Sequence, residues 1–376
     1  MAALTVVTSS FPGATQGAEA AGSFVADFCL ELAAQATVTV VAPGEQAGSE
    51  DWHGLAVRRF AVPSGKPLSQ LRPAVPRDAL AIAGLLRSGQ AATHAAVAAG
   101  ADAVLALWAL PCGWWARRSA RAHGVPYGVW CLGSDIWVYG RKRLTRPLVR
   151  SVLSGAALRW ADGLALAREV ESLAGASCAF LPSSRRLPAL APALRDSPPY
   201  RLTFIGRWHP NKGTDLLMEA LGLLNDHDWQ RIGQVQIHGG GPLEEVVRAD
   251  AARLVAAGRP VQVFGFIGKD EAARVLAVTD WLLIPSRIES IPVVFSDALA
   301  AGTPVIATPV GDLPELLGEH AVGVCASAAT AAGMAAAIRE AVNGVPGAHA
   351  GALATLARDF DIRRSAADVL RDLPGR

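Results

Sequence analysis

The chain has 376 residues, which is enough for about two domains of ordinary size. Hydrophobic residues make up 51% of it and charged residues 18%, a composition that excludes a disordered chain. The formal net charge of +2 comes from 35 basic and 33 acidic side chains and provides no basic footprint for nucleic acid.

The apolar patterning, the start of the sequence and the cysteines favour a cytoplasmic protein. No run of about 18 apolar residues lacks charges or helix breakers, so no spanning helix is predicted. The start, Met1–Val7, carries no basic region and is interpreted as a first strand, not a signal peptide. The five cysteines are an odd number without a CxxC motif, which favours reduced buried thiols.

In the first half, β-branched segments alternate with Ala/Leu-rich helical patterns, which is the rhythm of parallel α/β units. The predicted elements in chain order are a strand over Leu4–Thr8, a helix over Ala20–Ala34, strands over Val38–Ala42 and Leu55–Phe60, a helix over Arg77–Ala99, a strand over Ala103–Leu107, a helix over Trp114–His123, a strand over Tyr127–Cys131 and a helix over Leu144–Ala161. Leu181–Pro199 then holds five prolines and no clean period, so Ser183–Tyr200 is predicted as an interdomain linker.

The alternation of strand and helix patterns resumes after this segment. The predicted elements are a strand over Leu202–Gly206, a helix over Gly213–Leu224, a strand over Val235–His238, a helix over Leu243–Ala256, strands over Val261–Phe264 and Trp281–Ile284, a helix over Pro292–Ala301, a strand over Val305–Ala307 and helices over Thr330–Val342, Ala350–Arg358 and Ser365–Leu373. The domain prediction is 1–182, a linker at 183–200, a second domain at 201–357 and a helical tail at 358–376 that is free to pack back on the first domain. Both domains read as doubly wound sheets, whose ligands bind at the carboxyl ends of the strands.

The sharpest signal is the segment Gly206-Arg-Trp-His-Pro-Asn-Lys-Gly213, which follows a predicted strand and opens a helix. Arg207 and Lys212 lie five positions apart across a turn, so both can point to one spot above the strand end. Two cations beside the free N–H groups of a helix start suit a diphosphate. The alternative is a pair of solvated loop cations.

A second signal runs from Pro285 to Ala307, in the sequence PSRIESIPVVFSDALAAGTPVIA. Glu289 lies in a loop after a strand, and Asp297 lies about two turns further on. Carboxylates accept hydrogen bonds from sugar and ribose hydroxyls, and free N–H groups near Ser290–Val293 suit a phosphate. The alternative is a helix N-terminal charge and a solvated Asp.

A third segment, His238-Gly-Gly-Gly-Pro242, lies between a strand and a helix. Glycines allow a ligand to approach the backbone closely. Together and in this order, the three segments resemble the retaining glycosyltransferases of family four across roughly Arg201–Leu317. The resemblance implies the GT-B fold, with two Rossmann-like doubly wound α/β domains that face each other across a cleft, the first for the acceptor and the second for the donor.

The resemblance also implies roles for single residues. Arg207 and Lys212 would bind the diphosphate of a UDP- or GDP-sugar, and Glu289 would touch its sugar. Asp297 would touch the ribose, although the family usually has Glu there. The residues implied in catalysis are Arg207, Lys212 and Glu289. The residues implied in donor binding are Arg207, Lys212, Gly239, Gly240, Gly241, Phe266, Ile267, Glu289, Ser290, Ile291, Pro292 and Asp297.

The first domain resembles the family with departures. The loop after the first strand looks like the family's glycine-rich loop, and its Gly13, Gly17 and Gly22 are candidates for the acceptor side. Asp135 is a candidate for sugar or acceptor binding, with a helix cap as the alternative. Leu132 stands where relatives have a His proposed to touch the donor sugar. Two consequences of this substitution stay open: the protein has lower transferase activity than its relatives, or it has lost that activity.

The implied reaction needs no protein base if the leaving phosphate oxygen takes the acceptor proton on the same face. Arg207 and Lys212 would stabilise the charge on that leaving group, so no metal ion and no cofactor is expected. Asn225-Asp-His-Asp228 contains a DxD pattern, which is interpreted here as a turn.

Residues 114–150 combine a basic cluster, Gly140–Arg150, with several Trp residues. One interpretation is an anionic acceptor, such as a glycolipid, or peripheral contact with the inner face of a membrane. The other is a solvated helix face.

The leading hypothesis is therefore a sugar transferase that acts on a sugar, glycolipid or other hydroxyl acceptor. The alternative is a degenerate relative that binds a nucleotide or nucleotide-sugar without turnover, which Leu132 motivates. A Rossmann dehydrogenase is disfavoured because no GxGxxG follows the first strand.

Overall fold

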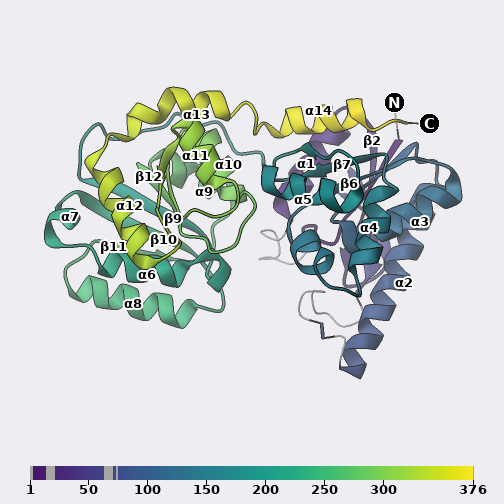
Figure 1. Ribbon diagram of the computed structural model, residues 1–376, viewed down its shortest axis with the longest axis horizontal. Helices are drawn as coiled ribbons and strands as arrows, with labels where there is room; N and C mark the ends of the chain where they lie inside the picture. Colours follow the sequence, from purple (N-terminus) through teal and green to yellow (C-terminus); the bar gives the residue numbers. More distant parts are fainter. Residues whose placement is uncertain (1–2, 14–21, 63–70, 73–74, 376) are drawn as a thin grey trace. The chain divides into compact units, whose positions relative to one another are not determined.

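The computed structural model describes residues 3–13, 22–62, 71–72 and 75–375. The chain divides into two compact units (Figure 1). Unit 1 comprises Met1–Pro182 together with Ile362–Arg376, and unit 2 comprises Ser183–Asp361. Each unit is built on a largely parallel sheet, so the predicted α/β class is confirmed.

In unit 1, the described strands form one sheet in the order β3-β4-β2-β1-β5-β6-β7-β8, and only the β3–β4 pair is antiparallel. The order reverses between β1 and β5, which makes this the switch point of the sheet. The strands are β1 (Ala3–Val7), β2 (Thr37–Gly44), β3 (Gly48–Trp52), β4 (Leu55–Ala61), β5 (Ala103–Leu107), β6 (Tyr127–Cys131), β7 (Leu158–Ala161) and β8 (Ala179–Phe180).

Helices cover both faces of the unit 1 sheet. On one face, α2 packs on α3 and α4 packs on α5, and the core there includes Leu85, Trp115 and Val149. On the other face, α1 lies beside α14, the returning C-terminal helix (Figure 1). The helices are α1 (Ser23–Ala33), α2 (Pro76–Ala98), α3 (Trp114–His123), α4 (Arg146–Ser154), α5 (Leu164–Ala174) and α14 (Ile362–Asp372), with short helical turns η2 (Ala109–Gly113) and η3 (Asp135–Gly140).

The single helix predicted over Leu144–Ala161 is wrong. The structure has α4, which stops before Gly155, and then strand β7 in parallel register with β6. Gly disfavours continuation of a helix. Leu158 pairs with Gly128 and Trp160 with Trp130, so the neighbouring strand decides the conformation of this apolar segment.

Unit 2 lies entirely within the described residues, and its sheet has the strand order β11-β10-β9-β12-β13-β14, all parallel. The order reverses between β9 and β12. Ligands of doubly wound sheets bind at the carboxyl ends of the strands at such a switch point. The strands are β9 (Tyr200–Arg207), β10 (Ile232–Gly240), β11 (Val261–Phe264), β12 (Trp281–Ile284), β13 (Val305–Ala307) and β14 (Gly323–Cys325).

The helices of unit 2 also lie on both faces of their sheet (Figure 1). One layer is formed by α6, α8 and α12, and the other by α9, α10 and α13. The helices are α6 (Thr214–Gly222), α7 (Asp226–Gln230), α8 (Glu244–Ala256), α9 (Lys269–Ala277), α10 (Val293–Ala301), α11 (Leu313–His320), α12 (Ala331–Asn343) and α13 (Ala350–Leu356), with turns η4 (Pro210–Lys212) and η5 (Pro346–His349).

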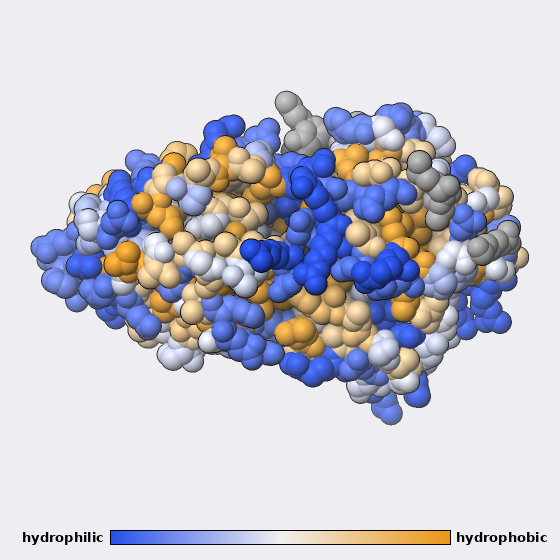
Figure 2. Space-filling view, turned by 90° about the horizontal axis from the view of Figure 1, so that it is seen from above, coloured by the Kyte–Doolittle hydropathy of each residue, from blue (hydrophilic) through white to orange (hydrophobic). Residues whose placement is uncertain are grey.

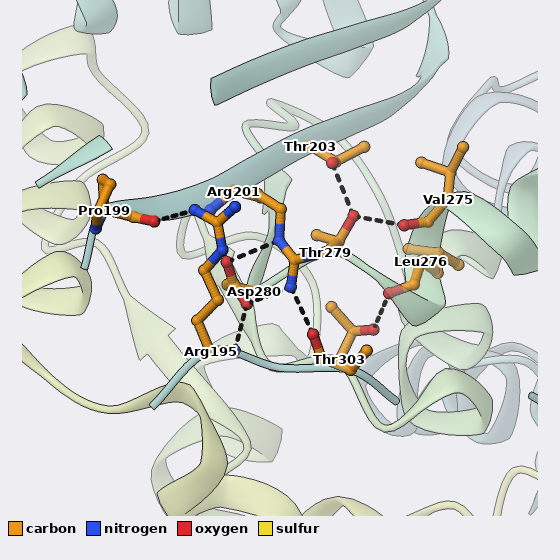
Figure 3. Close-up of polar contacts among 10 residues, drawn as sticks. Arg195, Pro199, Arg201, Thr203, Val275, Leu276, Thr279, Asp280 and Thr303 are labelled. Atoms are coloured by element: carbon orange, nitrogen blue, oxygen red, sulfur yellow. Dashed lines mark hydrogen bonds and ion pairs between the residues drawn. The ribbon is translucent and has the colours of Figure 1, made fainter. Parts of the chain in front are cut away.

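The segment predicted as the linker, Ser183–Tyr200, belongs to unit 2, and Tyr200 is already in β9. Figure 3 shows its anchor, the carboxylate of Asp280. Asp280 accepts hydrogen bonds from the backbone N–H groups of Arg195, at 2.8 Å, and Arg201, at 2.7 Å. The Arg201 guanidinium donates to both oxygens. Since Asp280 is 0% exposed, these bonds hold the segment firmly against the amino end of β12.

The described surface mixes polar and apolar residues. On the face seen in Figure 2, hydrophobic residues form small groups between hydrophilic ones. No helix within the described ranges has the length and apolar character needed to cross a membrane.

Candidate functional site at the switch point of unit 2

Two loops meet at the switch point of unit 2, one after β9 and one after β12. Arg207 is the last residue of β9, and its side chain is exposed. None of the residues that the structure describes forms a hydrogen bond or ion pair with the Arg207 guanidinium. An exposed cation at the carboxyl end of the central strand is therefore open to an anion.

Lys212 lies at the end of turn η4, five residues further on, and its ammonium group forms an ion pair with Glu289. Glu289 belongs to the loop after β12 and is half-buried. The predicted phosphate cation and the predicted sugar carboxylate thus come together, although they are 77 positions apart in the sequence. A bound diphosphate would compete with Glu289 for the charge of Lys212.

A second pair holds these loops in register. The Arg287 guanidinium donates to both oxygens of Asp215, at 2.7 and 2.9 Å, and to the carbonyl of Pro210, at 2.8 Å. The Arg287 backbone N–H donates to the carbonyl of Asn211 at 2.7 Å. The hydrogen bond to Asp215 raises the pKa of Arg287. Burial acts to raise the pKa of Asp215, but the hydrogen bonds to Arg287 and to the backbone, together with the Arg287 charge, outweigh it, so that pKa is lowered. Lys212 and Glu289 each lie next to this clamp in sequence.

Gly213 explains how closely the two loops approach. Its φ is +66°, and a β-carbon there would lie 1.9 Å from the carbonyl oxygen of Pro285. Only glycine avoids both the left-handed strain and this clash. Gly213 therefore lets the turn that carries Lys212 rest directly on the end of β12.

The glycine loop Gly239–Gly241 ends β10 beside β9. Gly239 has φ +146°, and a β-carbon there would lie 1.9 Å from the carbonyl oxygen of Gly206. Trp208 is fully buried beneath the loop and donates its backbone N–H to Gly240. The Phe266 ring lies over Gly240, and its residue is 63% exposed, whereas Ile267 is half-buried. Phe266 and Ile267, two of the predicted donor-binding residues, thus border the glycine loop.

His238 precedes the glycine loop and is buried. Its ring stacks on Phe264, with the centroids 4.6 Å apart and the planes 11° from parallel. Burial lowers the pKa of His238. The side chain therefore favours its neutral form at this edge of the site.

The loop before α10 is more buried than the sequence suggests. Ser290, Ile291 and Pro292 are all buried, and α10 begins at Val293. Asp297 is 1% exposed, and Arg185 donates to both of its oxygens. The carboxylate predicted to face a ribose is thus already engaged, while the half-buried Glu289 remains the more accessible acid of the two.

In unit 1, the loop after β1 supplies the predicted glycines. Gly13 is half-buried, and Gly17 lies outside the described residues. Gly22 precedes α1 with φ +85°, and a β-carbon there would meet the backbone of Phe11 at 2.8 Å. Gly22 is therefore required by the turn itself, whatever the loop binds.

Asp135 is 1% exposed, and its carboxylate forms hydrogen bonds with backbone N–H groups. Its oxygens accept hydrogen bonds from the N–H groups of Ala109, at 2.7 Å, and Leu132, at 3.2 Å. Burial raises the pKa of Asp135, and these hydrogen bonds oppose the rise. The carboxylate thus joins the ends of β5 and β6. It does not cap the next helix, because turn η3 begins at Asp135 itself, with Ser134 at its N-cap and no side-chain cap. Leu132 packs against the unit 1 core.

The DxD pattern is used inside unit 2. Asn225 and Asp228 form a capping box that starts α7, so the expected turn opens a short helix. Asp228 also accepts a hydrogen bond from Arg339 at 2.8 Å, and Asp226 forms an ion pair with Arg259.

Three residues of this region were not predicted from the sequence. Arg287 and Asp215 lie two and three positions from Glu289 and Lys212, so a search for opposite charges next to the motifs would find them. Arg185 has no such signal, since it lies in a proline-rich segment 112 positions before Asp297.

The chain is similar to known glycosyltransferases. Residues 199–343 match the family described as glycosyl transferases group 1. A D-inositol 3-phosphate glycosyltransferase of Corynebacterium efficiens is 34% identical over 127 residues, which cover 33% of this chain and 30% of that protein. The matched region is thus less than a third of the length of this curated relative.

Solved structures extend the similarity to both units. Sucrose-phosphate synthase of Thermosynechococcus elongatus has a TM-score of 0.72 at 16% identity, with 99% of each chain covered. The Anabaena protein HepE in complex with UDP-glucose has a TM-score of 0.69 at 16% identity, covering 99% of this chain and 100% of that one. These neighbours show the GT-B fold, as predicted. Residues 199–343 of this chain are a domain of the glycosyl transferases group 1 family.

Proposed function

We propose that this protein transfers a sugar from a UDP- or GDP-sugar to a hydroxyl acceptor, with retention of the anomeric configuration and without a metal ion. The observation that carries the proposal is the switch point of unit 2. There Arg207, which is exposed and not engaged by any described residue, ends strand β9, and the turn that follows carries Lys212 of the Lys212–Glu289 pair. The UDP-glucose complex of HepE supports a nucleotide-sugar as the donor.

The proposed roles follow from charge. Arg207 and Lys212 bind the diphosphate and stabilise the negative charge that grows on it as the sugar–phosphate bond breaks. Glu289 accepts a hydrogen bond from a hydroxyl of the donor sugar. The backbone of Gly239–Gly241 and of Phe266 and Ile267 lines the nucleotide.

The proposed transfer needs no protein base to accept the acceptor proton. The acceptor oxygen forms a bond to the anomeric carbon on the face that the diphosphate leaves. The electron pair of the broken bond stays on the phosphate oxygen, which takes the acceptor proton. This route leaves no step for a histidine, so it is compatible with Leu132.

The test is a single-turnover assay of a nucleotide-sugar panel with sugar and glycolipid acceptors, in which release of UDP or GDP and the anomer of the product are followed. Transfer with retention from at least one donor is expected, with no loss in EDTA. If no donor is consumed and Arg207→Ala binds UDP and GDP as well as wild type, the proposal is wrong.

A second candidate is nucleotide-sugar binding without turnover. Leu132 favours it, because a side chain without hydrogen-bonding groups stands where relatives have a histidine. Calorimetric binding of a nucleotide-sugar, with no consumption by any acceptor, would select this candidate.

We also propose that unit 1 contacts an anionic membrane or glycolipid through residues 114–150, on the cytoplasmic side. Leu144 is 95% exposed, and Arg141, Lys142, Arg143 and Arg146 are exposed around it. Basic residues with exposed apolar side chains favour such a surface. Co-sedimentation with vesicles containing 30% phosphatidylglycerol, but not with neutral vesicles, is expected for wild type and should be lost in Leu144→Glu.

A further inference from the structure

The backbone N–H groups of the turn between Arg207 and Lys212 are already engaged. The Asn211 N–H donates to the side chain of His209 at 3.2 Å, and Pro210 has no N–H. The other N–H groups of the turn donate to backbone carbonyls, at 2.8 to 3.2 Å: Trp208 to Gly240, His209 to Arg207, Lys212 to His209 and Gly213 to Pro210. An anion above this turn is therefore bound by side chains and not by these N–H groups.

His209 is half-buried at the N-cap of turn η4, and its ring takes part in the turn. The bond from Asn211 ends on Nδ1 of the imidazole. A backbone N–H is only a donor, so Nδ1 is the acceptor and carries no proton. In the neutral ring the proton is then on Nε2, which makes Nε2 a hydrogen-bond donor.

This donor is available and has a defined place. Among the residues that the structure describes, none accepts a hydrogen bond from Nε2 of His209. The other side of the turn is held by Arg287, which donates from its side chain to the carbonyl of Pro210 and from its backbone to that of Asn211. The turn is thus fixed from both sides, and the ring with it.

The neighbours of the ring point to the ligand. Arg207, two positions before His209, is exposed and unengaged among the described residues, and Lys212 follows three positions after it. Both lie at the carboxyl end of β9, at the switch point of the unit 2 sheet. A phosphate oxygen drawn to two cations is the nearest acceptor for an N–H donor between them.

Resting on the proposed function, we propose that His209 is a third diphosphate-binding side chain of the donor site, whose Nε2–H donates a hydrogen bond to a phosphate oxygen of the nucleoside diphosphate sugar. At the same time Nδ1 caps the turn that carries Lys212. A neutral imidazole adds a directed hydrogen bond to the anion without placing a third positive charge beside Lys212.

The first test separates the two ring nitrogens with a pair of variants. His209→Asn places an amide oxygen near the position of Nδ1 and no atom at Nε2, so it keeps the cap and loses the donor. His209→Gln places an amide nitrogen near the position of Nε2 and loses the acceptor at Nδ1.

Binding of UDP, or of GDP if it binds more tightly, is measured by calorimetry. We expect His209→Asn to bind about tenfold more weakly than wild type, the scale of one lost hydrogen bond to a charged group. We expect His209→Gln to bind more tightly than His209→Asn, although its melting temperature should be the lower of the two. Binding by His209→Gln that is equal to or weaker than that of His209→Asn would overturn the proposal. The exposed His227→Asn is the matched control and should keep wild-type affinity.

The second test identifies the part of the ligand that His209 contacts. Inorganic pyrophosphate, which has neither base nor sugar, is used to displace the nucleotide. Its affinity should fall in His209→Asn by the same factor as that of the nucleotide, because the lost contact is to phosphate. An unchanged affinity for pyrophosphate would overturn the proposal.

The outcomes separate this proposal from the proposed function. If neither UDP nor GDP binds to the wild-type protein, the donor function and the role of His209 both fall. If a nucleotide binds and a folded His209→Asn keeps full affinity, only the role of His209 falls. Should His209→Asn not fold, NMR of isotope-labelled histidine rings in wild type, assigned with His209→Gln, decides. Addition of pyrophosphate should shift the Nε2 resonance of His209, and an unshifted resonance would overturn the proposal.

Discussion

At the residue scale, the two cations of the candidate site differ in their state. Arg207 is exposed and unengaged among the described residues, whereas Lys212 is paired with Glu289. Phosphate must therefore displace Glu289 from Lys212, which lowers the net affinity of Lys212 for phosphate. Substitutions of Lys212 and Glu289 should therefore affect UDP binding differently.

Glu289→Gln removes the charge that competes for Lys212. We expect this variant to bind UDP at least as tightly as wild type, because UDP lacks the sugar that Glu289 contacts. Its transfer rate should fall about 100-fold, the scale of one lost transition-state contact. Lys212→Ala should instead weaken UDP about tenfold. Equal losses of UDP affinity in both variants, measured by calorimetry, would contradict these roles.

His238 provides a pH dependence of stability. Its pKa is lowered in the folded state by burial, so below about pH 6.5 the unfolded chain holds more protons than the folded one. The contribution of His238 to stability is therefore present above pH 6.5 and is lost as the pH falls. Urea unfolding from pH 5 to 7.5 should show a shallower acid loss in His238→Gln than in wild type. The exposed His227→Gln, as control, should follow wild type.

The residues that the sequence predicts best are those whose neighbours in space are neighbours in sequence. Arg207 and Lys212 flank one turn after one strand, so their shared location follows from local rules. The burial of Asp297 and Asp135 does not, because Arg185 lies 112 positions from Asp297 and Ala109 lies 26 positions from Asp135. Residue type and local spacing do not predict partners that are so distant in the sequence.

At the element scale, the loop after β9 depends on its contact with β12. Gly213→Ala would combine left-handed strain of about 1–2 kcal/mol with a clash against the backbone of Pro285. We expect unit 2 to lose at least about 2 kcal/mol of stability and UDP binding to fall. Thermal melting and calorimetry measure the two effects.

Gly222→Ala is the matched control at the end of the same helix. A β-carbon there meets nothing within 4 Å, and alanine favours a helix, so this variant should equal or exceed wild-type stability. A Gly213→Ala protein as stable as Gly222→Ala would show that the loop does not need the close approach.

Most elements follow from the alternation of strand and helix patterns, and the errors have a common cause. Leu158–Ala161 continues the apolar pattern of α4, yet it is strand β7 because β6 lies beside it. Likewise, Arg195 and Arg201 join a proline-rich segment to unit 2 through Asp280, a contact that no local pattern contains.

At the scale of the whole molecule, the chain returns to its first unit at the end. Ile362 and Val369 of helix α14, and Leu373 directly after it, lie in the unit 1 core. At about 1.5–3 kcal/mol per large buried side chain, these three residues contribute roughly 5–9 kcal/mol.

Removal of residues 362–376 should therefore unfold or strongly destabilise unit 1 and leave unit 2 folded. Thermal unfolding of the truncated protein, followed by calorimetry and by fluorescence, is expected to show one transition that is lost or lowered in temperature and one that is unchanged. A uniform shift of both transitions would contradict the assignment of α14 to unit 1.

The central claim is that Arg207 and Lys212 hold the diphosphate of a nucleotide-sugar donor. The most direct measurement is calorimetric titration of UDP and GDP into wild type, Arg207→Ala and Arg253→Ala, a control at an arginine whose side chain is 79% exposed on α8. We expect one nucleotide to bind wild type and Arg253→Ala equally, and Arg207→Ala to bind it at least about tenfold more weakly. Equal binding by all three proteins would contradict it.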